Sequence, residues 1–516
     1  MDGQTIDARR WWILAALCLS ALVIAFDRTI VNVALPALVR AFAATASQLQ
    51  WIVDTYTLAF AGLLLTTGSL GDRYGRKRAL LAGLALFGVG SALAATADSA
   101  GRLILIRGLM GSGAALIMPS TLAIVAVVFP PAERARAIGI CTAIVALGIP
   151  VGPIIGGWLL DRYSWHAVFL INLPIVALAL GASLILVPES RDARATALDP
   201  PGTVLSIAGL TALLWAIIEA PTRGWTNGAV LGALAAGVAT LALFLSWEAH
   251  CAQPLLDLRL FANPRFSAAI VSVTLVYFSL VGALFFVTQY LQFVLGYTAL
   301  GAGARIIPLA AGLGAGAPMG GALTARLGVR FVVAGGLLVA AGGLAVLLTL
   351  TMSSGYAPVA VALALFGLGM GLAAAPATDA IMGAAPPERV GVASAVNDMT
   401  QETGGALGVA VMGSVLASAY SVALTPAVRG LPAPLVTLAR AGLGDALLVA
   451  QRLGGGAGRE LAAAAKAAFI HAMTDAALVG VTVALAGAVV AALFLPPRTV
   501  AAPAIVSGTA RERSVS

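Results

Sequence analysis

The chain has 516 residues, of which 60% are apolar and only 10% are charged, and its mean hydropathy is +0.99. A soluble domain carries about 25% charged residues, because its surface must face water. This composition excludes an ordinary soluble protein and predicts an all-α, polytopic membrane protein covered by the lipid bilayer. The net charge of +8 comes from arginines scattered at the ends of apolar segments, so no nucleic-acid partner is expected.

The sequence contains no recognisable site for catalysis or cofactor chemistry. Cys18, Cys141 and Cys251 are far apart in the chain and lack the spacing of a metal site or a disulfide framework. The glycine-rich phosphate-binding loop of ATP-driven proteins is absent, which argues against direct ATP drive. We therefore expect no cofactor, no metal and no enzymatic activity.

Fourteen apolar runs are long enough to be membrane spans, since a spanning helix needs about 20 largely apolar residues. In chain order they are 12–36, 50–70, 79–97, 102–127, 137–160, 166–187, 203–220, 228–247, 267–292, 301–323, 331–351, 357–382, 391–417 and 474–495. The first run lacks an evident small-residue cleavage site, so we interpret it as a retained span.

The distribution of positive charge predicts the orientation of the chain. With the N-terminus inside, most of the 30 Lys and Arg residues fall in cytoplasmic segments, whereas the short outer loops hold only Arg40, Arg102, Arg162 and Arg223. Cytoplasmic loops of membrane proteins are enriched in Lys and Arg. We expect a multi-pass protein of the bacterial inner membrane with both termini in the cytoplasm.

The first span carries two charged residues, Asp27 and Arg28. Asp27 lies about 13 Å from the outer end of this span, at about 1.5 Å per residue, and Arg107 lies a few residues into span four from the same side. Ionised side chains inside a span usually face a partner or a cavity. We predict that Asp27 and Arg107 meet and take part in proton coupling. A purely structural ion pair is the alternative, and Arg28 competes as a partner, although adjacent residues point to different helix faces.

The loop after span two reads Gly68-Ser69-Leu70-Gly71-Asp72-Arg73-Tyr74-Gly75-Arg76-Lys77-Arg78. Glycines allow helix ends to approach closely, and Asp72 can accept hydrogen bonds from an arginine or from the N-terminus of a neighbouring helix. We predict a gating latch formed by Gly68, Asp72, Arg73, Gly75 and Arg76. The alternative is a positive inner loop that only sets topology.

Span five carries Gly148, Gly152 and Gly156 on one helix face, with Pro150 and Pro153 between them. Small residues four apart let another helix approach within van der Waals contact, and proline removes backbone donors and favours a bend. This pattern predicts an interface at which helices rock, with static packing as the alternative.

Span nine offers aromatic and amide side chains that suit flat, amphipathic or cationic molecules. The candidates for substrate contact are Tyr277, Phe286, Gln289, Tyr290 and Phe293. Aromatic residues that face lipid or the membrane boundary are the alternative interpretation.

Span thirteen carries Asp398 and Glu402, which are four residues apart and share one helix face. Two acids on one buried face cannot easily both be charged, so we predict a proton carrier or a cation site there. The alternative is a solvated cytoplasmic helix end. Asp54, Glu219 and Asp379 lie near span ends, and we interpret them as solvated residues.

The long outer loop 418–473 contains a segment, 433–471, in which Ala and Leu mix with charged residues around Gly454 to Gly456. We predict two short amphipathic helices joined by a glycine turn and lying on the outer membrane face. A gate or a substrate-capturing element is the alternative.

Four motifs in order resemble one known family. The loop 68–78 is similar to the signature loop of the major facilitator superfamily. The segment Phe26 to Pro36 resembles the first-span motif of the fourteen-span drug:proton antiporters. Leu103 to Ala115 is similar to the fourth-span motif of the superfamily, and Gly148 to Gly157 is similar to the fifth-span antiporter motif. In the second half, residues 321–328 echo residues 68–75, with Ala325 in place of the acid.

The resemblance implies two six-helix bundles with two extra central spans, which alternate access to a central cavity. The implied domains are 1–187, the linker spans 188–266, the second bundle 267–495 with outer loop 418–473, and a cytoplasmic tail 496–516. The implied function is efflux of hydrophobic or cationic drugs in exchange for protons. A proton symporter that imports a small metabolite and a lipid or metabolite flippase remain alternatives, and whether a periplasmic adaptor binds stays open.

Overall fold

The computed structural model describes residues 3–191, 199–251, 254, 256, 258–384 and 390–495, apart from some side chains in α1, α2, α5 and α16, and every element in these ranges is helical. The tail 496–516 lies outside the described residues. The elements are α1 (Gly3–Phe42), α2 (Ala46–Tyr74), α3 (Arg76–Ala94), α4 (Ala100–Val128), α5 (Pro131–Arg162), α6 (Ala167–Leu170), α7 (Asn172–Leu186), α8 (Pro200–Arg223), α9 (Gly228–His250), α10 (Leu258–Phe261), α11 (Pro264–Gln289), the π-helical turn η1 (Tyr290–Val294), α12 (Ala299–Ala304), α13 (Ile307–Leu327), α14 (Val329–Leu347), α15 (Tyr356–Ala384), α16 (Val390–Leu424), α17 (Ala433–Ala441), α18 (Leu443–Leu453) and α19 (Gly455–Phe494).

Each of the fourteen predicted spans falls on a helix or on two consecutive helices. Within the described residues, twelve segments are long and apolar enough to cross a membrane, and α2 is a thirteenth when its two pieces, bent by 52°, are taken together. The remaining predicted span falls on α5, a helix of 32 residues. The span count of fourteen is therefore consistent with the structure.

Several span boundaries differ from prediction. The predicted span 166–187 is broken at Ile171 into α6 and α7, and the predicted span 301–323 is broken after α12. The last span does not begin at 474, because α19 already begins at Gly455 and continues for 40 residues. Between Gly458 and Phe494 the sequence has no proline and is rich in alanine, the strongest helix former, so nothing interrupts the helix.

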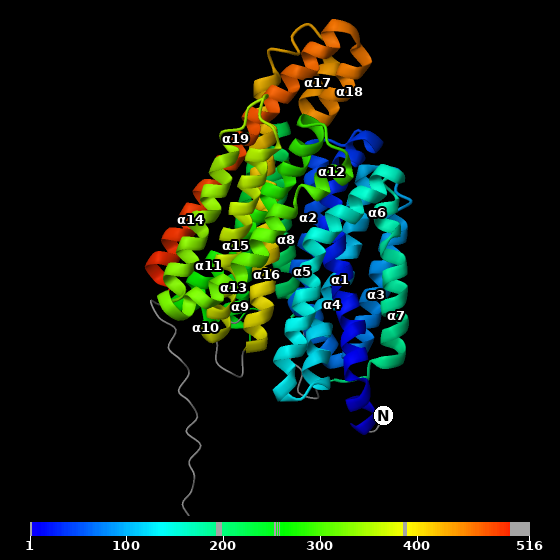
Figure 1. Ribbon diagram of the computed structural model, residues 1–516, viewed down its shortest axis with the longest axis vertical. Coiled ribbons are helices and arrows are strands. Elements are labelled where there is room, and N and C mark those ends of the chain that lie inside the picture. Colours follow the sequence, from blue (N-terminus) through cyan, green and yellow to red (C-terminus); the bar gives the residue numbers. More distant parts are fainter. Residues whose placement is uncertain are drawn as a thin grey trace, which may run out of the picture.

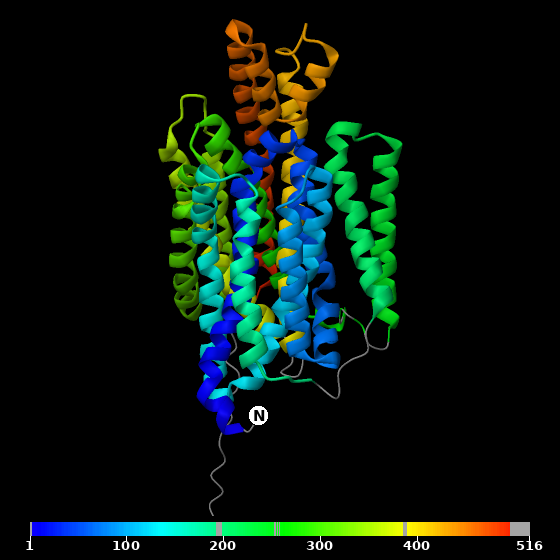
Figure 2. The ribbon, with the colours of Figure 1, turned by 90° about the vertical axis from the view of Figure 1, so that its right-hand side faces the viewer.

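The long helices run roughly alongside one another and both ends of the described chain lie at the same end of the molecule, which we call the terminal end (Figure 1). The opposite end carries α17, α18 and the start of α19, which together form the segment 433–471 that we call the hairpin, and we call this end the hairpin end. Helices α1 to α7 form a first group, and α11 to α16 with α19 form a second group (Figures 1 and 2). These groups follow the implied bundles, whose residue bounds stay a prediction.

The two linker helices α8 and α9 pack on each other, and α8 also contacts α2 and α16. The Thr66 and Thr203 hydroxyls lie 2.5 Å apart, and Ser47 donates to Glu219 at 2.7 Å. Ser414 of α16 donates to the Ile217 carbonyl at 2.7 Å. Helix α8 is thus hydrogen-bonded to both groups, and α9 stands on its outer side (Figure 2).

The corner between α2 and α3 recurs between α13 and α14, as the sequence repeat predicts. Gly75 has φ +120° and Gly328 has φ +86°, and each ends one helix and begins the next. A residue with a Cβ atom rarely adopts such angles, so both corners depend on glycine.

The hairpin differs from its prediction in shape. Two short helices, α17 and α18, precede the glycine turn, in which Gly454 and Gly455 both have positive φ. The segment after the turn is the first part of α19 and continues into the last span. The hairpin therefore projects beyond the other helices (Figure 1) and does not lie flat on a membrane face.

The hairpin is docked through the N-terminal turn of α18. A Cβ atom at Gly444 would overlap Val39 of α1 and would lie 3.1 Å from Phe293 of η1. Asp445, the next residue, is 1% exposed, and neither carboxylate oxygen has a hydrogen-bond partner among the described residues. Burial raises the pKa of the Asp445 carboxyl from its ordinary value of 3.8 to about 7.

This burial predicts that hairpin docking weakens as the pH rises. The docked carboxyl ionises only near pH 7, whereas an undocked one ionises near pH 4, so ionisation favours the undocked state progressively between these values. Hydrogen exchange of the α18 amides, corrected for intrinsic rates, should show more protection at pH 5.5 than at pH 8. Asp445→Asn should remove this difference, and Glu460→Gln, at an exposed acid of α19, should preserve it. Greater protection at pH 8 would contradict the prediction.

The close packing of α5 on α1 gives a second prediction. A Cβ atom at Gly152 would overlap the Thr29 hydroxyl, whereas one at Gly181 of α7 would meet nothing within 4 Å. Gly152→Ala should therefore lower the free energy of unfolding by about 1–3 kcal/mol through overpacking, measured by thermal unfolding in detergent, and Gly181→Ala should not. Gly152→Leu should abolish transport while protein remains in the membrane. Normal transport in that variant would reduce the pattern to incidental glycines.

Candidate functional site

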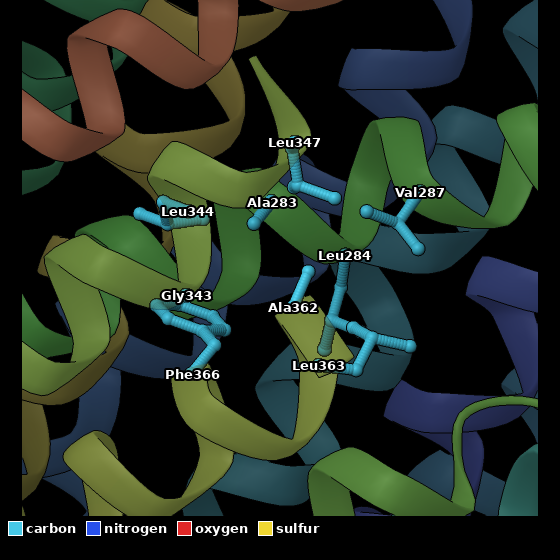
Figure 3. A pocket seen from close by; sticks show the side chains of 9 residues that line it. All are labelled: Ala283, Leu284, Val287, Gly343, Leu344, Leu347, Ala362, Leu363 and Phe366. Atoms are coloured by element: carbon cyan, nitrogen blue, oxygen red, sulfur yellow. The ribbon is translucent and has the colours of Figure 1, made fainter. Parts of the chain in front are cut away.

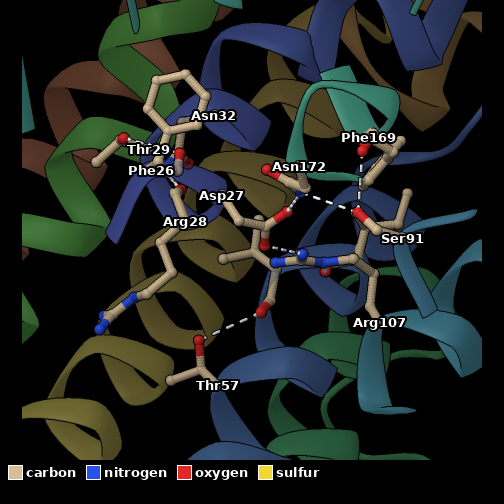
Figure 4. A network of polar contacts seen from close by, with 12 residues as sticks. Phe26, Asp27, Arg28, Thr29, Asn32, Thr57, Ser91, Arg107, Phe169 and Asn172 are labelled. Carbon is tan, nitrogen blue, oxygen red and sulfur yellow. Dashed lines mark hydrogen bonds and ion pairs between the residues drawn. The ribbon is translucent and has the colours of Figure 1, made fainter. Parts of the chain in front are cut away.

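A buried ion pair lies at the centre of the first helix group. The Arg107 guanidinium of α4 donates to the Asp27 carboxylate of α1, and both side chains are almost completely buried. Asn172, at the start of α7, donates to the other Asp27 oxygen at 3.0 Å and lies 2.9 Å from the Ser91 hydroxyl of α3. Four helices thus converge on Asp27 (Figure 4).

The guanidinium of Arg107 is fixed by two further contacts from α2. Its Nε donates to the Ile52 carbonyl at 3.2 Å, and its Cζ lies 4.2 Å from the centre of the Tyr56 ring. A cation over an aromatic face is attracted by the ring's quadrupole. The positive charge beside Asp27 is therefore held in one position by backbone, ring and carboxylate together.

A second ion pair joins the two helix groups. Arg28 of α1 points away from Asp27 (Figure 4) and pairs with the Glu402 carboxylate of α16. The other Glu402 oxygen is buried and has no hydrogen-bond partner among the described residues. The sequence predicts that Glu402 meets protons or cations, whereas the pairing of Arg28 with Glu402 is a finding of the structure.

The two acids of span thirteen have different surroundings. Glu402 is 5% exposed, whereas Asp398 is partly exposed and accepts a hydrogen bond from the Asn397 amide at 3.3 Å. Neither is a fully solvated helix end. Tyr277 of α11 lies within electrostatic reach of Arg28, Glu402 and Asp398, so one predicted substrate-contact residue borders this charged cluster.

The other predicted substrate-contact residues do not face this cluster together. Phe286 and Tyr290 are almost completely buried, and Gln289 donates to the Phe285 carbonyl of its own helix at 2.9 Å. Phe293 lies against Gly444 of the hairpin. Their role in substrate contact stays a prediction.

A small cavity lies inside the second helix group, between α11, α14 and α15 (Figure 3). Its lining is wholly apolar and includes Leu284, Leu344 and Phe366. None of the predicted substrate-contact residues lines it. A second small cavity lies where α2, α8 and α16 meet and is lined partly by Thr57 and Thr403, the latter adjacent to Glu402.

The loop between α2 and α3 makes its contacts within its own group. Asp72 pairs with Arg76 at 2.7 Å, and Arg73 lies over the Tyr74 ring. Gly75 faces the Glu189 carboxylate, to which a Cβ atom would approach within 2.6 Å, and Gly68 lies against Pro119 of α4. Asp72 thus accepts from an arginine at the start of the neighbouring helix α3, one of the partners predicted for it. Among the described residues it has no hydrogen bond to the second helix group, and its role as a latch stays a prediction.

The glycine face of α5 packs against α1. A Cβ atom at Gly148 would lie 2.9 Å from Ala25, and one at Gly156 would lie 2.9 Å from Ile30. The Pro153 carbonyl lies on the other side, against Gly303 of α12 in the second group. The side chain of Pro150 lies outside the described residues. Helix α5 therefore joins both groups by backbone contact.

Asp54 contradicts its sequence-based interpretation. It was expected to be a solvated residue near a span end, but its side chain is 0% exposed and both carboxylate oxygens lack hydrogen-bond partners among the described residues. It is one helical turn from Gln50, which reaches the Val409 carbonyl of α16 at 3.4 Å. Helix α2 packs on α4, α8 and α16, and a single sequence does not reveal which span ends such packing covers.

Asn172 and Tyr56 were not predicted to belong to the site. Both residues lie among apolar residues within a predicted span. Only the presence of a polar side chain in an apolar segment could have indicated that they belong to the site.

Comparisons with known proteins agree with this architecture. The sequence pattern of the Major Facilitator Superfamily matches residues 17–409. The chain is 38% identical to the multidrug resistance protein Stp of Mycobacterium tuberculosis over 424 residues, which cover 82% of this chain and 79% of that protein. It is 36% identical to the multidrug efflux pump LfrA of Mycolicibacterium smegmatis, over 93% of this chain and 95% of that protein.

Two further similarities extend this comparison. The methyl viologen resistance protein SmvA of Salmonella typhimurium is 34% identical over 464 residues, which cover 90% of this chain and 93% of that protein. Among solved structures, an inward-facing bacterial homologue of the human lysosomal transporter Spinster superposes with a TM-score of 0.65 at 20% identity, over 96% of this chain and 99% of that one. The latter likeness concerns the fold alone. The chain belongs to the Major Facilitator Superfamily.

Proposed function

We propose that this protein exports hydrophobic and cationic drugs or biocides from the cell in exchange for protons. The observation that carries the proposal is a fully enclosed carboxylate, Asp27, paired with Arg107 in a chain whose relatives named above are a multidrug resistance protein, an efflux pump and a methyl viologen resistance protein. Methyl viologen is a flat dication, which fits the expected substrate class. The chain acts in the inner membrane with its termini in the cytoplasm.

The contacts between the two helix groups support alternating access. Among the described residues, the hydrogen bonds between α1–α7 and α11–α19 run from Arg28 towards the hairpin end, and include Gln292 to the Val33 carbonyl at 3.0 Å and Gln50 to the Val409 carbonyl at 3.4 Å. With the termini in the cytoplasm, the hairpin end faces outward. The structure then represents a state closed on the outer side.

Proton coupling is assigned to the Asp27–Arg107 pair. Asp27 has no exposure, so a proton can reach it only when the surrounding helices move. Removing one member of a buried ion pair leaves the other uncompensated, at a cost of about 3–5 kcal/mol. Movement that alters the contacts of Arg107 or Asn172 would therefore change how readily Asp27 holds a proton. Asp54, buried without a partner, is a further candidate for carrying a proton, since an unpaired buried carboxylate is costly.

Substrate binding is assigned to the cluster around Glu402. Arg28 is paired with the Glu402 carboxylate, and Tyr277, which interacts electrostatically with both residues, is the aromatic residue proposed for this site. A cationic substrate would replace Arg28 as the partner of Glu402, which releases a contact between the two helix groups. A proton symporter that imports a metabolite is less well supported, because the relatives named above are resistance and efflux proteins.

The coupling role predicts that Asp27→Asn abolishes uncoupler-sensitive efflux, because the amide keeps the shape of the side chain but cannot exchange a proton. Arg107→Ala should also impair efflux, since Asp27 loses its cationic partner. The measurement is dye transport into everted membrane vesicles under an imposed pH gradient, with and without an uncoupler. Asp98→Asn is the control, because Asp98 is exposed and its partners among the described residues, Arg102 and Ser99, belong to its own group. Wild-type coupling in Asp27→Asn would move the proton site elsewhere.

The binding role predicts that Glu402→Gln reduces transport of a cationic substrate more than that of a neutral one. Only a cation gains from the carboxylate, and the amide leaves the volume of the side chain unchanged. The same vesicles are assayed with one substrate of each kind. Asp379→Asn, at an exposed acid of α15, removes a similar charge and should affect neither. Equal losses for both substrates would instead make Glu402 a proton carrier or a structural residue.

A further inference from the structure

An acidic side chain joins the two helix groups at the hairpin end. Asp161 lies in the last turn of α5, and its carboxylate accepts hydrogen bonds from two backbone amides of the second group. Ala299 donates to Oδ1 at 3.1 Å, and Leu300 donates to Oδ2 at 3.3 Å. Hydrogen bonds to an ionised acceptor are stronger than those between neutral groups. Both oxygens are therefore engaged across the boundary between the groups.

The hydrogen bonds of Asp161 lie next to an interface at which backbone atoms of α5 and α12 meet. A Cβ atom at Gly157, one turn before Asp161, would overlap the Leu300 backbone, and one at Gly303 would overlap the Pro153 carbonyl. Such contacts bring the backbones of α5 and α12 close together at both glycines.

The two backbone amides that donate to Asp161 have no acceptor within their own helix, α12. Ala299 and Leu300 begin α12, where the first backbone N–H groups lack an intrahelical partner, and the amide of Gly301 is bound by the Thr298 hydroxyl at 3.1 Å. Asp161 itself is exposed. When the groups separate, water can replace each partner, so breaking the contact leaves no buried polar group unsatisfied. The contact suits repeated opening.

The opposite end of the molecule shows the complementary arrangement. Asp72 near the terminal end is paired with Arg76 inside its own group and has no hydrogen bond across the boundary among the described residues. Among the described residues, the Asp161 carboxylate joins the two groups at the hairpin end, whereas the Asp72 carboxylate does not join them at the terminal end. We propose that Asp161 is the latch that holds the hairpin end closed, and that it must release the amides of Ala299 and Leu300 before substrate can leave. The inference rests on the alternating access of the proposed function.

The test measures the separation of the two groups at the hairpin end. Spin labels are placed at Thr96, between α3 and α4, and at Ser353, between α14 and α15, in a background with Cys18, Cys141 and Cys251 replaced by alanine; both label sites are exposed. Electron–electron resonance then gives the distance distribution in detergent or nanodiscs. Asp161→Ala should shift the distribution to longer distances, with a rise of roughly tenfold in the open-to-closed ratio, as expected from losing a charge-assisted hydrogen bond.

Two variants complete the design. Asp161→Asn keeps one acceptor oxygen and loses the charge, so its distribution should lie between those of wild type and Asp161→Ala. Asp98→Ala removes an exposed acid at the same end that contacts only its own group, and should resemble wild type. An unchanged distribution in both Asp161 variants, or an equal shift in Asp98→Ala, would overturn the latch.

The outcome is independent of the transport assay, because the distances are measured without substrate or pH gradient. A shift in Asp161→Ala together with absent drug export by the wild type would retain the latch and reject the proposed substrates. Normal efflux with no shift in either Asp161 variant would retain the proposed function and reject the latch. Should Asp161→Ala fail to fold, the milder Asp161→Asn decides the question by the same distances.

Discussion

The structure depends on the need to pair every charge that is buried inside a lipid-covered bundle. An ionised side chain in such a place is expensive unless a partner compensates it. Asp27 satisfies this need with Arg107 and Asn172 inside the first helix group, whereas Arg28, the next residue, satisfies it with Glu402 of the second group. Two adjacent residues on one helix thus carry opposite charges with different consequences. The first pair stays within one body, and the second must break when the bodies separate.

Glycine supplies the complementary property, which is the close approach of helix backbones. Gly148, Gly152 and Gly156 bring α5 against α1, and Gly157 brings the same helix against α12. A helix that meets its neighbours through backbone atoms leaves few side chains interlocked between them. Charge pairs therefore join particular helices, while glycines let the backbones of neighbouring helices meet. Asp161, in the last turn of α5, adds hydrogen bonds to α12, and hydrogen bonds depend on direction.

The sequence predicted what depends on local pattern and missed what depends on packing. Apolar run length located all fourteen segments, and the spacing from the outer ends brought Asp27 and Arg107 together, because helix geometry is regular. Asp54 was misjudged, because its burial depends on the packing of α2 against other helices, some of them far away in the chain, such as α16. The hairpin was predicted to lie flat on the membrane face, because the last apolar run begins only at residue 474. The run gave no indication that its helix, α19, already begins at Gly455. The Arg28–Glu402 pair was missed, because no local signal records contacts between distant helices.

The corner between two helices occurs twice, at residues 68–75 and at residues 321–328. Comparing the two copies distinguishes the contribution of the glycine from that of the acid. Gly75 and Gly328 both have positive φ, so the corner keeps its shape in each half. The first copy carries Asp72 beside Arg76, and the second carries Ala325 and so has no charge with which to accept from an amide or an arginine. Corner geometry is therefore a property of the glycine, whereas the ion pair at the corner is a property of the acid. Because the second copy lacks the acid, pseudo-symmetry cannot supply an equal latch in both halves. A carboxylate placed elsewhere, on α5 at the opposite end, is the kind of contact that can balance a single acidic corner.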